Sequence, residues 1–523
     1  MFDDLKMFVR YVGGLGRFLS RPQTLEESRR RIEHHMRTRE ESFLRILERG
    51  VFSNPKSPYR RLFTHAGIEL GDVARGVRHE GVEETLEKLY HQGVYITLDE
   101  FKGRRPIQRP GLEFPVSPSD FDNPLSALDY ETQTGGSRGT GTRIIIDFDL
   151  LAHEAAYLHL FLTAFDLMGR PVGFWGPIPP AAAPMKNILR SAKVGVSPER
   201  WFTQNRWTLR LDRWKPFLFT AYAVYGSRLL GKPLPIPESM PLERASLVAR
   251  WLAAKKEDGM PALFYTNPSS GVRICLAAKE TGLDIGGTFF RFSAEPYTSA
   301  KARLVSEAGC NTASFYGMAE IGNIGLPCAA PSALDDVHLA IDKLAVIQRN
   351  TPVGESELSV GALFYTTLLP SCPKLMINVG SGDYGILEDR RCGCLLEEMG
   401  FHQHLHDIRS YDKLTSEGMT FLGSELISLV EDVLPARFGG SPTDYQFIEE
   451  EEAGLTKVSI VVSPRVGEVD EGQLITTVLS VLGSFPGSKK MMAERWREAA
   501  TPRVIRREPY ATRAAKILPL HIL

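Results

Sequence analysis

The pattern of apolar and polar positions predicts that the chain begins with a run of helices. Residues 21–50 are rich in Arg, Glu and Leu at helical spacing, and Thr24 and Glu27 have the spacing of a capping box. Further short helical patterns follow, and then an apolar run at 94–97 that is typical of a strand. We therefore expect a helical extension over about residues 1–110.

The middle of the chain alternates between apolar runs of strand length and helical patterns. The runs lie at 144–146, 172–175, 262–265, 287–292 and 311–316. A helix is expected over 151–168, and shorter strands separated by turns are expected over 353–388. Strands that alternate with helices are typical of an α/β fold with a mostly parallel sheet.

After Arg409 the pattern becomes that of a smaller unit. It predicts a helix, two strands and a second helix, near 422–434, 444–450, 456–462 and 470–483. The 523 residues exceed the roughly 250–300 at which a single core stops growing. We expect a large multi-layer N-terminal α/β domain over 1–408 and a small, mobile α+β C-terminal domain over 409–523.

Composition and charge restrict the class of function. Hydrophobic residues make up 43% and charged residues 24% of the chain, which are ordinary globular values. The formal net charge of −1 provides no bulk attraction to nucleic acid or to an anionic membrane. No apolar run approaches the roughly 20 residues that span a bilayer, and charges interrupt the first twenty residues. We expect a cytoplasmic protein without a nucleic-acid or membrane partner, and a homodimer is left open.

A glycine-rich segment is the first candidate for chemistry. Four glycines stand among the seven residues 135–141, flanked by Thr134 and Thr142. Glycines let the backbone approach a ligand closely, and backbone N–H groups can bind phosphate oxygens. No Gly-Lys-Ser/Thr follows, so this is not a Walker loop, and we expect no strand directly before it, which excludes a dinucleotide fingerprint. A flexible surface loop would have the same composition.

Two further motifs suit a nucleotide. In Tyr316-Gly317-Met318-Ala319-Glu320, an aromatic ring could stack on a purine and a carboxylate could coordinate Mg²⁺ between phosphates. In Gly382-Asp383, the carboxylate could bind both ribose hydroxyls. Taken singly, each motif fits equally well a core tyrosine, a surface glutamate or an aspartate that hydrogen-bonds its own turn.

The order of these motifs resembles that of the adenylate-forming superfamily, over about residues 50–516. The order is the glycine loop, Ala294-Glu295-Pro296, Tyr316 to Glu320, Gly382-Asp383, Arg409 and Lys516. The loop ends in Thr142 rather than lysine, and 54–63 and 93–103 look like the N-terminal region of one branch. That branch contains phenylacetate–coenzyme A ligase and an acyl-protein synthetase.

The resemblance implies roles for individual residues. Phosphate contacts would come from Thr134, Gly136, Ser137, Arg138, Gly139 and Thr140. The adenine pocket would be lined by Ala294, Glu295, Pro296, Gly317 and Met318, with Tyr316 stacked on the base. Glu320 would hold Mg²⁺, and Asp383 would bind ribose with help from Arg409. Lys516 would reach the substrate carboxylate and the α-phosphate, which makes Lys516, Glu320 and Arg138 the expected catalytic residues.

The implied reaction is ATP-dependent activation of a carboxylic acid through an acyl-adenylate. Transfer to coenzyme A, to a phosphopantetheine carrier protein or to an amine would follow. Arg138 and Gly141 replace the usual threonine and proline, and the motifs after Arg409 are poorly kept, so the acceptor stays open. A stand-alone adenylating enzyme that serves a partner protein and a non-catalytic nucleotide-binding relative are the alternatives. An aryl or fatty acid would suit the aromatic residues Phe174, Trp175, Trp201 and Trp207, which fit a plain core equally well.

The cysteines suggest a metal site rather than disulfide bonds. Six cysteines are few for this length, and Cys392 and Cys394 form a close pair, with Cys328 and His338 upstream. Three thiolates and an imidazole are a tetrahedral zinc set, and the resemblance favours structural zinc. Reduced cysteines in a core are the alternative. His402, His404 and His406 alternate along an expected strand and are interpreted as surface or packing residues, although one of them could replace His338.

Overall fold

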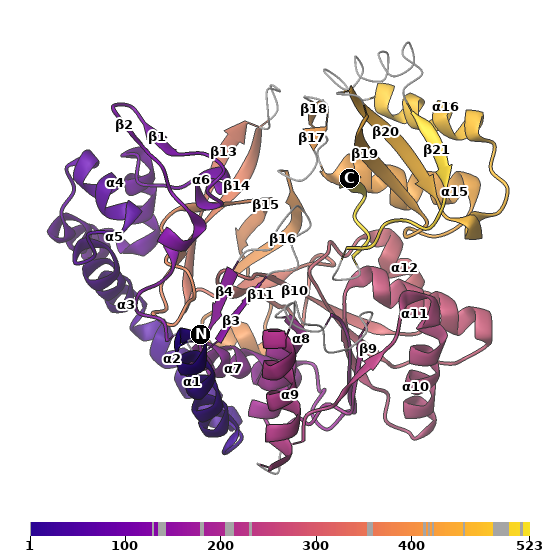
Figure 1. The fold of residues 1–523 in the computed structure, drawn as a ribbon, viewed down its shortest axis with the longest axis horizontal. Helices are drawn as coiled ribbons and strands as arrows, with labels where there is room; N and C mark the ends of the chain where they lie inside the picture. Colours follow the sequence, from indigo (N-terminus) through magenta and orange to yellow (C-terminus); the bar gives the residue numbers. More distant parts are fainter. Residues whose placement is uncertain are drawn as a thin grey trace.

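The centre of the computed structural model is a sheet of twelve strands (Figure 1). The structure describes residues 2–127, 130–133, 143–177, 183–203, 214–229, 233–352, 359–411, 415–416, 419–420, 423–452, 455–484, 502–512 and 516–522. The strands of the sheet, in spatial order, are β13 (Leu344–Pro352), β14 (Ser359–Thr367), β15 (Val379–Asp389), β16 (Gln403–Ser410), β12 (Val337–Leu339), β11 (Gly322–Pro327), β10 (Asn311–Met318), β9 (Phe289–Ser293), β8 (Leu263–Thr266), β5 (Val172–Trp175), β6 (Arg200–Thr203) and β7 (Pro237–Ser239).

The sheet has a parallel half and an antiparallel half. All pairs from β10 to β7 are parallel, whereas the pairs from β10 to β11 and from β13 to β16 are antiparallel. The expected runs at 172–175, 262–265, 287–292 and 311–316 are confirmed as β5, β8, β9 and β10. The expectation of short strands over 353–388 is wrong, because β14 and β15 run for nine and eleven residues and pair with neighbours on both sides.

Helices cover both faces of the parallel half. On one face lie α1 (Phe2–Leu19), α2 (Leu25–Arg37), α7 (Phe148–Ala164), α8 (Ala183–Lys193) and α9 (Trp214–Leu229). On the other face lie η4 (Leu242–Arg244), α10 (Ala245–Glu257), α11 (Pro268–Thr281) and α12 (Ser299–Glu307). Alternate residues along each strand pack into the two cores. Phe264 and Phe290 pack toward α10–α12, whereas Tyr265 and Phe289 pack toward α7.

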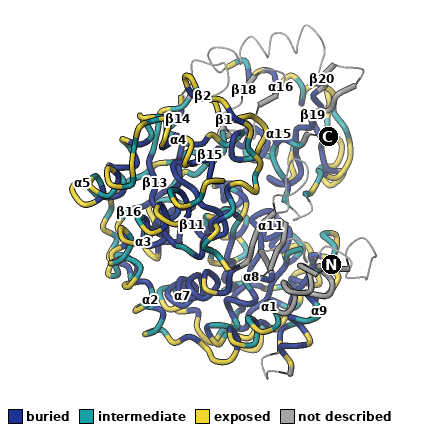
Figure 2. Tube along the Cα trace, turned by 60° about the vertical axis from the view of Figure 1, so that its left-hand side comes forward, coloured by how far each residue is buried: buried dark blue, intermediate teal, exposed yellow. Residues whose placement is uncertain are grey.

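Helix α7 lies in the centre of the larger core and confirms the helix expected over 151–168. The Asp147 side chain accepts hydrogen bonds from the backbone of Asp149 and Leu150, which starts the helix. Nearly all of its residues are buried (Figure 2). Helices buried on all sides lack an amphipathic stripe, so a polar side chain on α7 requires a partner inside the protein.

The N-terminal region is helical, as expected. It contains α3 (Arg39–Ile46), η1 (Leu47–Phe52), α4 (Pro58–Ala66), α5 (Leu70–His91), α6 (Leu98–Phe101), η2 (Pro118–Phe121) and the hairpin β1 (Ile107–Arg109) and β2 (Leu112–Phe114). The Thr24–Glu27 capping box is confirmed. The strand expected at 94–97 is wrong: Ile96 makes only an isolated bridge to Val379, because Thr97 and Glu100 cap the start of α6.

The residues after 423 form a second, smaller unit. Its elements are α14 (Gly423–Ser428), η6 (Leu429–Val433), α15 (Leu434–Phe438), β19 (Tyr445–Glu452), β20 (Leu455–Val462), η7 (Pro464–Val466), α16 (Glu471–Gly483), β21 (Arg503–Arg506) and β22 (Leu520–Ile522). The strands order as β21-β20-β19-β22 over a separate core. The expected helix–strand–strand–helix succession is confirmed, and β21 and β22 were not anticipated. The division at 408/409 stays a prediction.

The smaller unit packs on α12 of the larger one through a buried ion pair. The Lys301 ammonium lies 2.8 Å from a Glu431 carboxylate oxygen, and both side chains are buried. Thr298, which caps α12, donates a further hydrogen bond to Glu431. A short hairpin of β17 (Thr415–Ser416) and β18 (Met419–Thr420) lies between the two units in the sequence.

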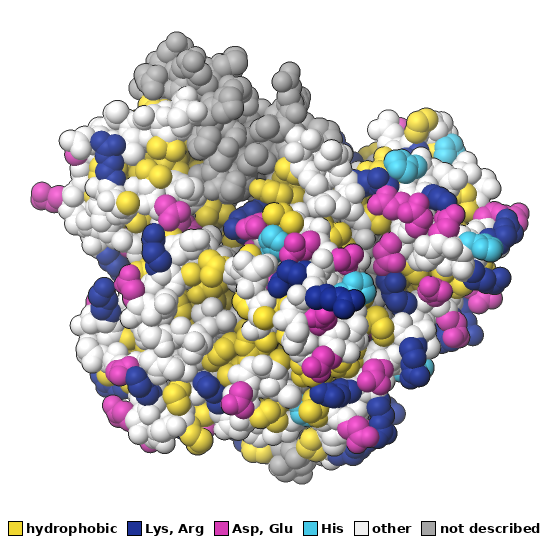
Figure 3. Space-filling model, turned by 180° about the vertical axis from the view of Figure 1, so that it is seen from behind, with side chains coloured by type: hydrophobic (Ala, Val, Ile, Leu, Met, Phe, Trp, Pro, Cys, Tyr) yellow, Lys and Arg dark blue, Asp and Glu magenta, His cyan; other side chains and the backbone are white. Residues whose placement is uncertain are grey.

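The surface carries charges of both signs. On the face opposite to that of Figure 1, basic and acidic side chains are interspersed rather than separated by sign (Figure 3). Among the residues that the structure describes, no helix combines the length and the apolar character needed to cross a bilayer.

Candidate active site

Two of the predicted nucleotide residues, Glu295 and Glu320, lie at one edge of the sheet, together with Ser269, to which the sequence analysis assigned no role. Ser269 follows β8, Glu295 follows β9 and Glu320 follows β10, so all three lie at carboxyl ends of parallel strands. This edge is also where β10 turns back as the antiparallel β11. Open α/β sheets bind ligands at the carboxyl ends of their strands, where the strand order or direction changes. This carboxyl edge of the parallel strands is therefore where an α/β fold is expected to hold a ligand.

Tyr316 and Asp383 are in direct contact. The Tyr316 hydroxyl donates a hydrogen bond to Asp383 Oδ2 at 2.8 Å, and the buried Tyr365 hydroxyl donates to Tyr316 Oη at 3.4 Å. Burial, followed by the Asp383 carboxylate, raises the pKa of Tyr316 well above its usual value, so its hydroxyl stays protonated. β10 and β15 thus place an aromatic ring and a carboxylate side by side.

Glu320 is paired with a lysine to which the sequence analysis assigned no role. The Lys102 ammonium lies 2.5 Å from Glu320 Oε1, and the Glu320 side chain is buried. Lys102 directly follows α6, whose capping box of Thr97 and Glu100 holds the short helix in place. This capping box was the sequence signal that could have pointed to Lys102.

The segment after β9 combines an unusual backbone conformation with a buried carboxylate. Ala294 has a φ of 77°, which residues with a side chain rarely adopt. Glu295 Oε2 accepts hydrogen bonds from the backbone and the hydroxyl of Ser269, at 3.0 and 2.7 Å. Glu295 Oε1 is buried without a hydrogen-bond partner among the described residues. Burial raises the pKa of Glu295, while Lys301 and Lys516 oppose that rise.

Lys516 of the smaller unit lies within electrostatic reach of this carboxylate. Its charge acts on Glu295, although the two residues are far apart in the sequence. The backbone N–H of Lys516 donates to the Thr512 hydroxyl at 3.1 Å, and a bridge between Ala511 and Ile517 closes the loop that carries it. The fold thus brings Lys516 within electrostatic range of Glu295, whereas the catalytic role that the resemblance implies for Lys516 stays a prediction.

The other expected residues of this region are also close by. Arg409 on β16 pairs with Tyr384 on β15, which is the residue after Asp383. The Arg409 guanidinium lies 3.0 Å from an Asp335 carboxylate oxygen. Gly317 leaves no room for a side chain, because a Cβ there would lie 2.7 Å from the Gly322 carbonyl oxygen. Met318 ends β10, and the Pro296 carbonyl accepts a hydrogen bond from Lys301.

The glycine loop lies outside the described residues, so the expectations for six of its members stay predictions. These residues are Thr134, Gly136, Ser137, Arg138, Gly139 and Thr140. The flanking strands β3 (Tyr130–Gln133) and β4 (Arg143–Ile146) pair antiparallel. The expectation that no strand precedes the loop is wrong, because β3 ends directly before it. A hairpin still differs from the strand–loop–helix of a dinucleotide site.

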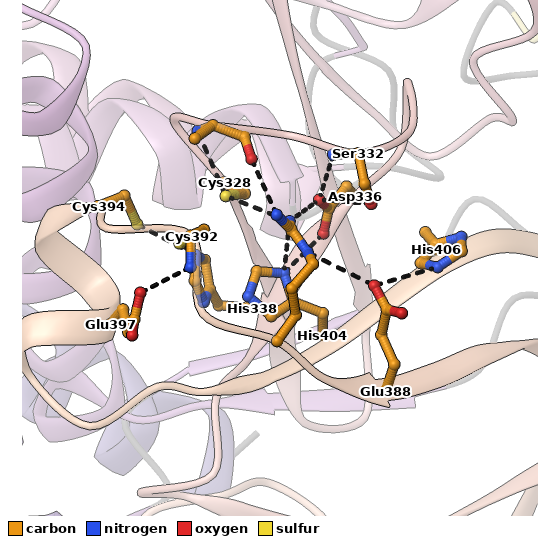
Figure 4. Close-up of polar contacts among 12 residues, drawn as sticks. Cys328, Ser332, Asp336, His338, Glu388, Cys392, Cys394, Glu397, His404 and His406 are labelled. Atoms are coloured by element: carbon orange, nitrogen blue, oxygen red, sulfur yellow. Dashed lines mark hydrogen bonds and ion pairs between the residues drawn. The ribbon is translucent and has the colours of Figure 1, made fainter.

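The predicted metal ligands meet in one cluster on the antiparallel half (Figure 4). Cys328, His338, Cys392 and Cys394 offer ligand atoms that all lie within 4.8 Å of one another. His338 Nε2 lies 3.2 Å from Cys394 Sγ and 3.7 Å from Cys392 Sγ. His338 Nδ1 lies 2.7 Å from the Phe401 carbonyl, and a proton on Nδ1 leaves Nε2 free to bind a metal.

The electrostatics of the cluster favour a thiolate. Cys328 and then His338 lower the pKa of Cys394, although burial opposes this. His404 is buried with Nδ1 2.8 Å from Asp336, which supports its interpretation as a packing residue. Cys328, Asp336 and His404 also lie within 4.8 Å, so His404 borders the cluster. The short helix α13 (Leu395–Glu398) begins at Cys394, and Glu397 accepts hydrogen bonds from the backbone of Cys392 and Gly393.

Comparisons with known proteins identify the fold. No family model and no curated protein matches the sequence. The structure is similar to 2-hydroxyisobutyryl-CoA ligase in the postadenylation state in complex with R3-HIB-AMP, with 15% identity and a TM-score of 0.52 over 93% of this chain and 89% of that one. The same ligase in complex with 2-HIB-AMP matches at 15% identity with a TM-score of 0.51, over the same shares. The chain therefore has the fold of 2-hydroxyisobutyryl-CoA ligase, whereas the resemblance to the adenylate-forming superfamily and to its phenylacetate branch stays a prediction.

Proposed function

We propose that this chain activates a carboxylic acid with MgATP, forming an acyl-adenylate and pyrophosphate. A carboxylate oxygen would attack the α-phosphorus of ATP, and the bond from that phosphorus to the bridging oxygen would break as pyrophosphate leaves. The observation that carries the proposal is that Lys516 of the smaller unit is close enough to the carboxyl edge of the sheet for its charge to act on Glu295. A lysine ammonium at that edge can stabilise the charge that develops on the phosphorus.

The other residues of the edge suit the parts of a nucleotide. Glu295 Oε1 is a buried acceptor without a described partner and suits the amino group of adenine. The Tyr316 ring can stack on the base, and Asp383 beside it can accept from ribose hydroxyls. Glu320 would hold Mg²⁺, which neutralises phosphate charge when bound, while Lys102 orients the carboxylate.

ATP–pyrophosphate exchange with a panel of carboxylic acids tests this proposal. Lys516→Ala should lower the exchange rate by roughly 100-fold or more, because the transition state loses a positive charge. Lys279→Ala removes an exposed lysine on α11 and should leave the rate unchanged. Equal activity in wild type and Lys516→Ala, or no exchange with any acid, would contradict the proposal and favour a non-catalytic nucleotide-binding protein.

The acceptor is proposed to be a thiol, with an amine as the other outcome. Adding coenzyme A or a phosphopantetheine carrier protein to an acid that supports exchange should produce a thioester. An acyl-adenylate that accumulates with every added thiol would instead point to a stand-alone enzyme that serves a partner.

We also propose that the cysteine–histidine cluster holds a structural zinc ion. Its three sulfur atoms and one imidazole nitrogen match the preferred ligands of zinc, and the backbone carbonyl of Phe401 orients His338. The cluster lies on the antiparallel half, so the ion would hold the β11–β12 and β15–β16 connections together.

A further inference from the structure

Two buried cations near the proposed site have no hydrogen-bonding or ionic partner among the described residues. Lys186 on α8 is 6% exposed, and Arg291 on β9 is 4% exposed. No side-chain hydrogen bond contributes to the pKa of Lys186, and Arg291 Nε lacks a hydrogen-bond partner. Removing a charge from water without pairing it costs several kcal/mol, so proteins rarely retain such groups without a use.

Arg291 occupies a core position on the α7–α8 side of the sheet. Its neighbours Phe290 and Phe292 pack toward α10–α12, so Arg291 points the opposite way. The guanidinium carbon lies 3.6 Å from the centre of the Phe315 ring and 4.9 Å from that of Tyr265. Parallel strands buried on both faces normally carry apolar residues, which makes an arginine here an exception.

The same side of the sheet has more positive than negative charge. Glu154 on α7 binds Arg190 at 3.0 Å and Lys343 at 3.3 Å, and its carboxylate also acts on Lys186 and Arg291. Burial alone would raise the pKa of Glu154, but the cations outweigh this effect and lower it to about 2. One carboxylate therefore faces four buried cations.

The nearby carboxylates are already paired. Glu320 binds Lys102 at 2.5 Å, and Asp342 binds His153 at 2.9 Å and accepts a hydrogen bond from the Tyr157 hydroxyl. No carboxylate of the described residues forms an ion pair with Lys186 or Arg291, although Glu154 and Glu320 act on the pKa of Lys186 and Glu154 acts on that of Arg291. Within the described part of the chain, positive charge therefore exceeds negative charge here, which suits a bound anion.

We infer that the activated acid carries a second negative group, as in a dicarboxylic acid, and that Lys186 and Arg291 bind this group. The inference rests on the proposed acid activation. Arg291 is two residues before the end of β9, which places it roughly 7 Å from the strand ends where Lys516 acts. The reacting carboxylate would lie near Lys516, and the far carboxylate would lie between α8 and β9. The Phe315 and Tyr265 rings lie against the Arg291 guanidinium, and this class of acid refines the expectation of an aryl or fatty acid.

Exchange assays with matched acids test the inference. Adipate, monomethyl adipate and hexanoate have the same carbon chain but differ in the charge of the far end. In wild type, adipate should be preferred over the other two acids in kcat/KM by roughly 30-fold or more. Arg291→Met and Lys186→Met should each remove most of this preference, mainly through KM, while Arg291→Lys should keep part of it.

Three results would overturn the inference. The first is equal use of adipate and hexanoate by wild type. The second is an equal loss of both acids in Arg291→Met, which would place the arginine at the reacting carboxylate. The third is a preference for adipate that survives both methionine variants.

A binding measurement separates this inference from the proposed function. If no acid supports exchange, acid activation fails, and calorimetry with adipate then decides the inference by itself. Adipate should bind to wild type and bind at least tenfold more weakly to Lys186→Met, with hexanoate as the uncharged-end control. Absence of adipate binding to wild type would refute it. Circular dichroism and thermal melting identify a variant that fails to fold, and the wild-type comparison of the acids does not depend on any variant.

Discussion

The cysteine–histidine cluster and the buried cation group differ in the sign of the ligand charge that each one suits. The first gathers three thiols and an imidazole, which suit a metal cation. The second sets Lys186, Arg190, Arg291 and Lys343 against Glu154, which suits an anion. Both are buried in the large domain, yet one is built from β-strand connections and the other from α7, α8 and β9. The comparison shows that unbalanced buried charge can indicate a ligand of either sign.

The largest expected effect is the loss of a metal ligand. Cys394→Ser should abolish zinc binding and lower the free energy of unfolding by about 4 kcal/mol, because a bound metal stabilises only the folded state. Metal analysis of the purified protein and denaturant unfolding measure both quantities. Cys275→Ser changes a buried cysteine outside the cluster and should keep the metal. Zinc retained at full occupancy in Cys394→Ser would contradict the proposal that this cluster binds the metal.

The next effect concerns the carboxylate that faces the cations. Glu154→Gln keeps the shape of the side chain but leaves Arg190 and Lys343 without a negative partner. The free energy of unfolding should fall by about 3 kcal/mol. Saturating adipate should restore part of the loss, since an anion can replace the missing charge. Unchanged stability of Glu154→Gln would mean that the cations do not depend on this carboxylate.

A smaller effect is the pH dependence of adipate binding. Burial lowers the pKa of Lys186 from its ordinary 10.5 to about 8, with Glu154 and Glu320 opposing this shift and Arg190 and Lys343 adding to it. Lys186 is charged in both the folded and the unfolded state below pH 8. Between pH 8 and 10.5 its proton is lost first from the folded state, so its contribution to stability rises with pH.

Adipate binding should change in the opposite direction, because the bound anion favours charged Lys186. The affinity should fall by up to about tenfold between pH 7.5 and pH 9. Calorimetry at both values measures the change, and Lys186→Arg, which keeps its charge, should lower the slope. An equal slope in wild type and Lys186→Arg would assign the titration to another group.

The smallest effect is expected at an exposed ion pair. Arg200 lies 2.7 Å from Glu238, but both side chains are well exposed. Glu238→Gln should change the free energy of unfolding by about 0.5 kcal/mol or less, since solvent screens the pair. Chemical denaturation alongside Glu154→Gln gives the contrast. A loss as large as that of Glu154→Gln would show that burial is not what distinguishes the two sites.

Much of the architecture was predictable because it depends on local periodicity. The strands β5, β8, β9 and β10 were recognised as apolar runs, and the Thr24–Glu27 capping box marked the start of a helix. The run at 94–97 was misinterpreted, since the capping residues of α6 outweigh its strand-like composition. The terminal strands β21 and β22 were missed because each is short and pairs with residues distant in the sequence.

The candidate site was predictable only in part. Tyr316, Glu320, Asp383 and the four proposed zinc ligands stand in recognisable motifs, and the described structure brings several of them together. Lys102 lay within the range 93–103 but was assigned no role, and Arg291 was included only as part of the expected strand at 287–292. Lys186 was not singled out, because a lysine on a helix normally lies at the surface.

The amino-acid sequence by itself determined the order of strands and helices and the motif residues, because both depend on neighbours along the chain. Tertiary structure alone decided that Lys516 of the small unit lies within electrostatic reach of Glu295, and that four cations surround Glu154. Charge balance depends on burial and on distances between segments far apart in the chain, which no local pattern contains. The excess of positive charge around Glu154 therefore became visible only when α7, α8 and β9 were seen together.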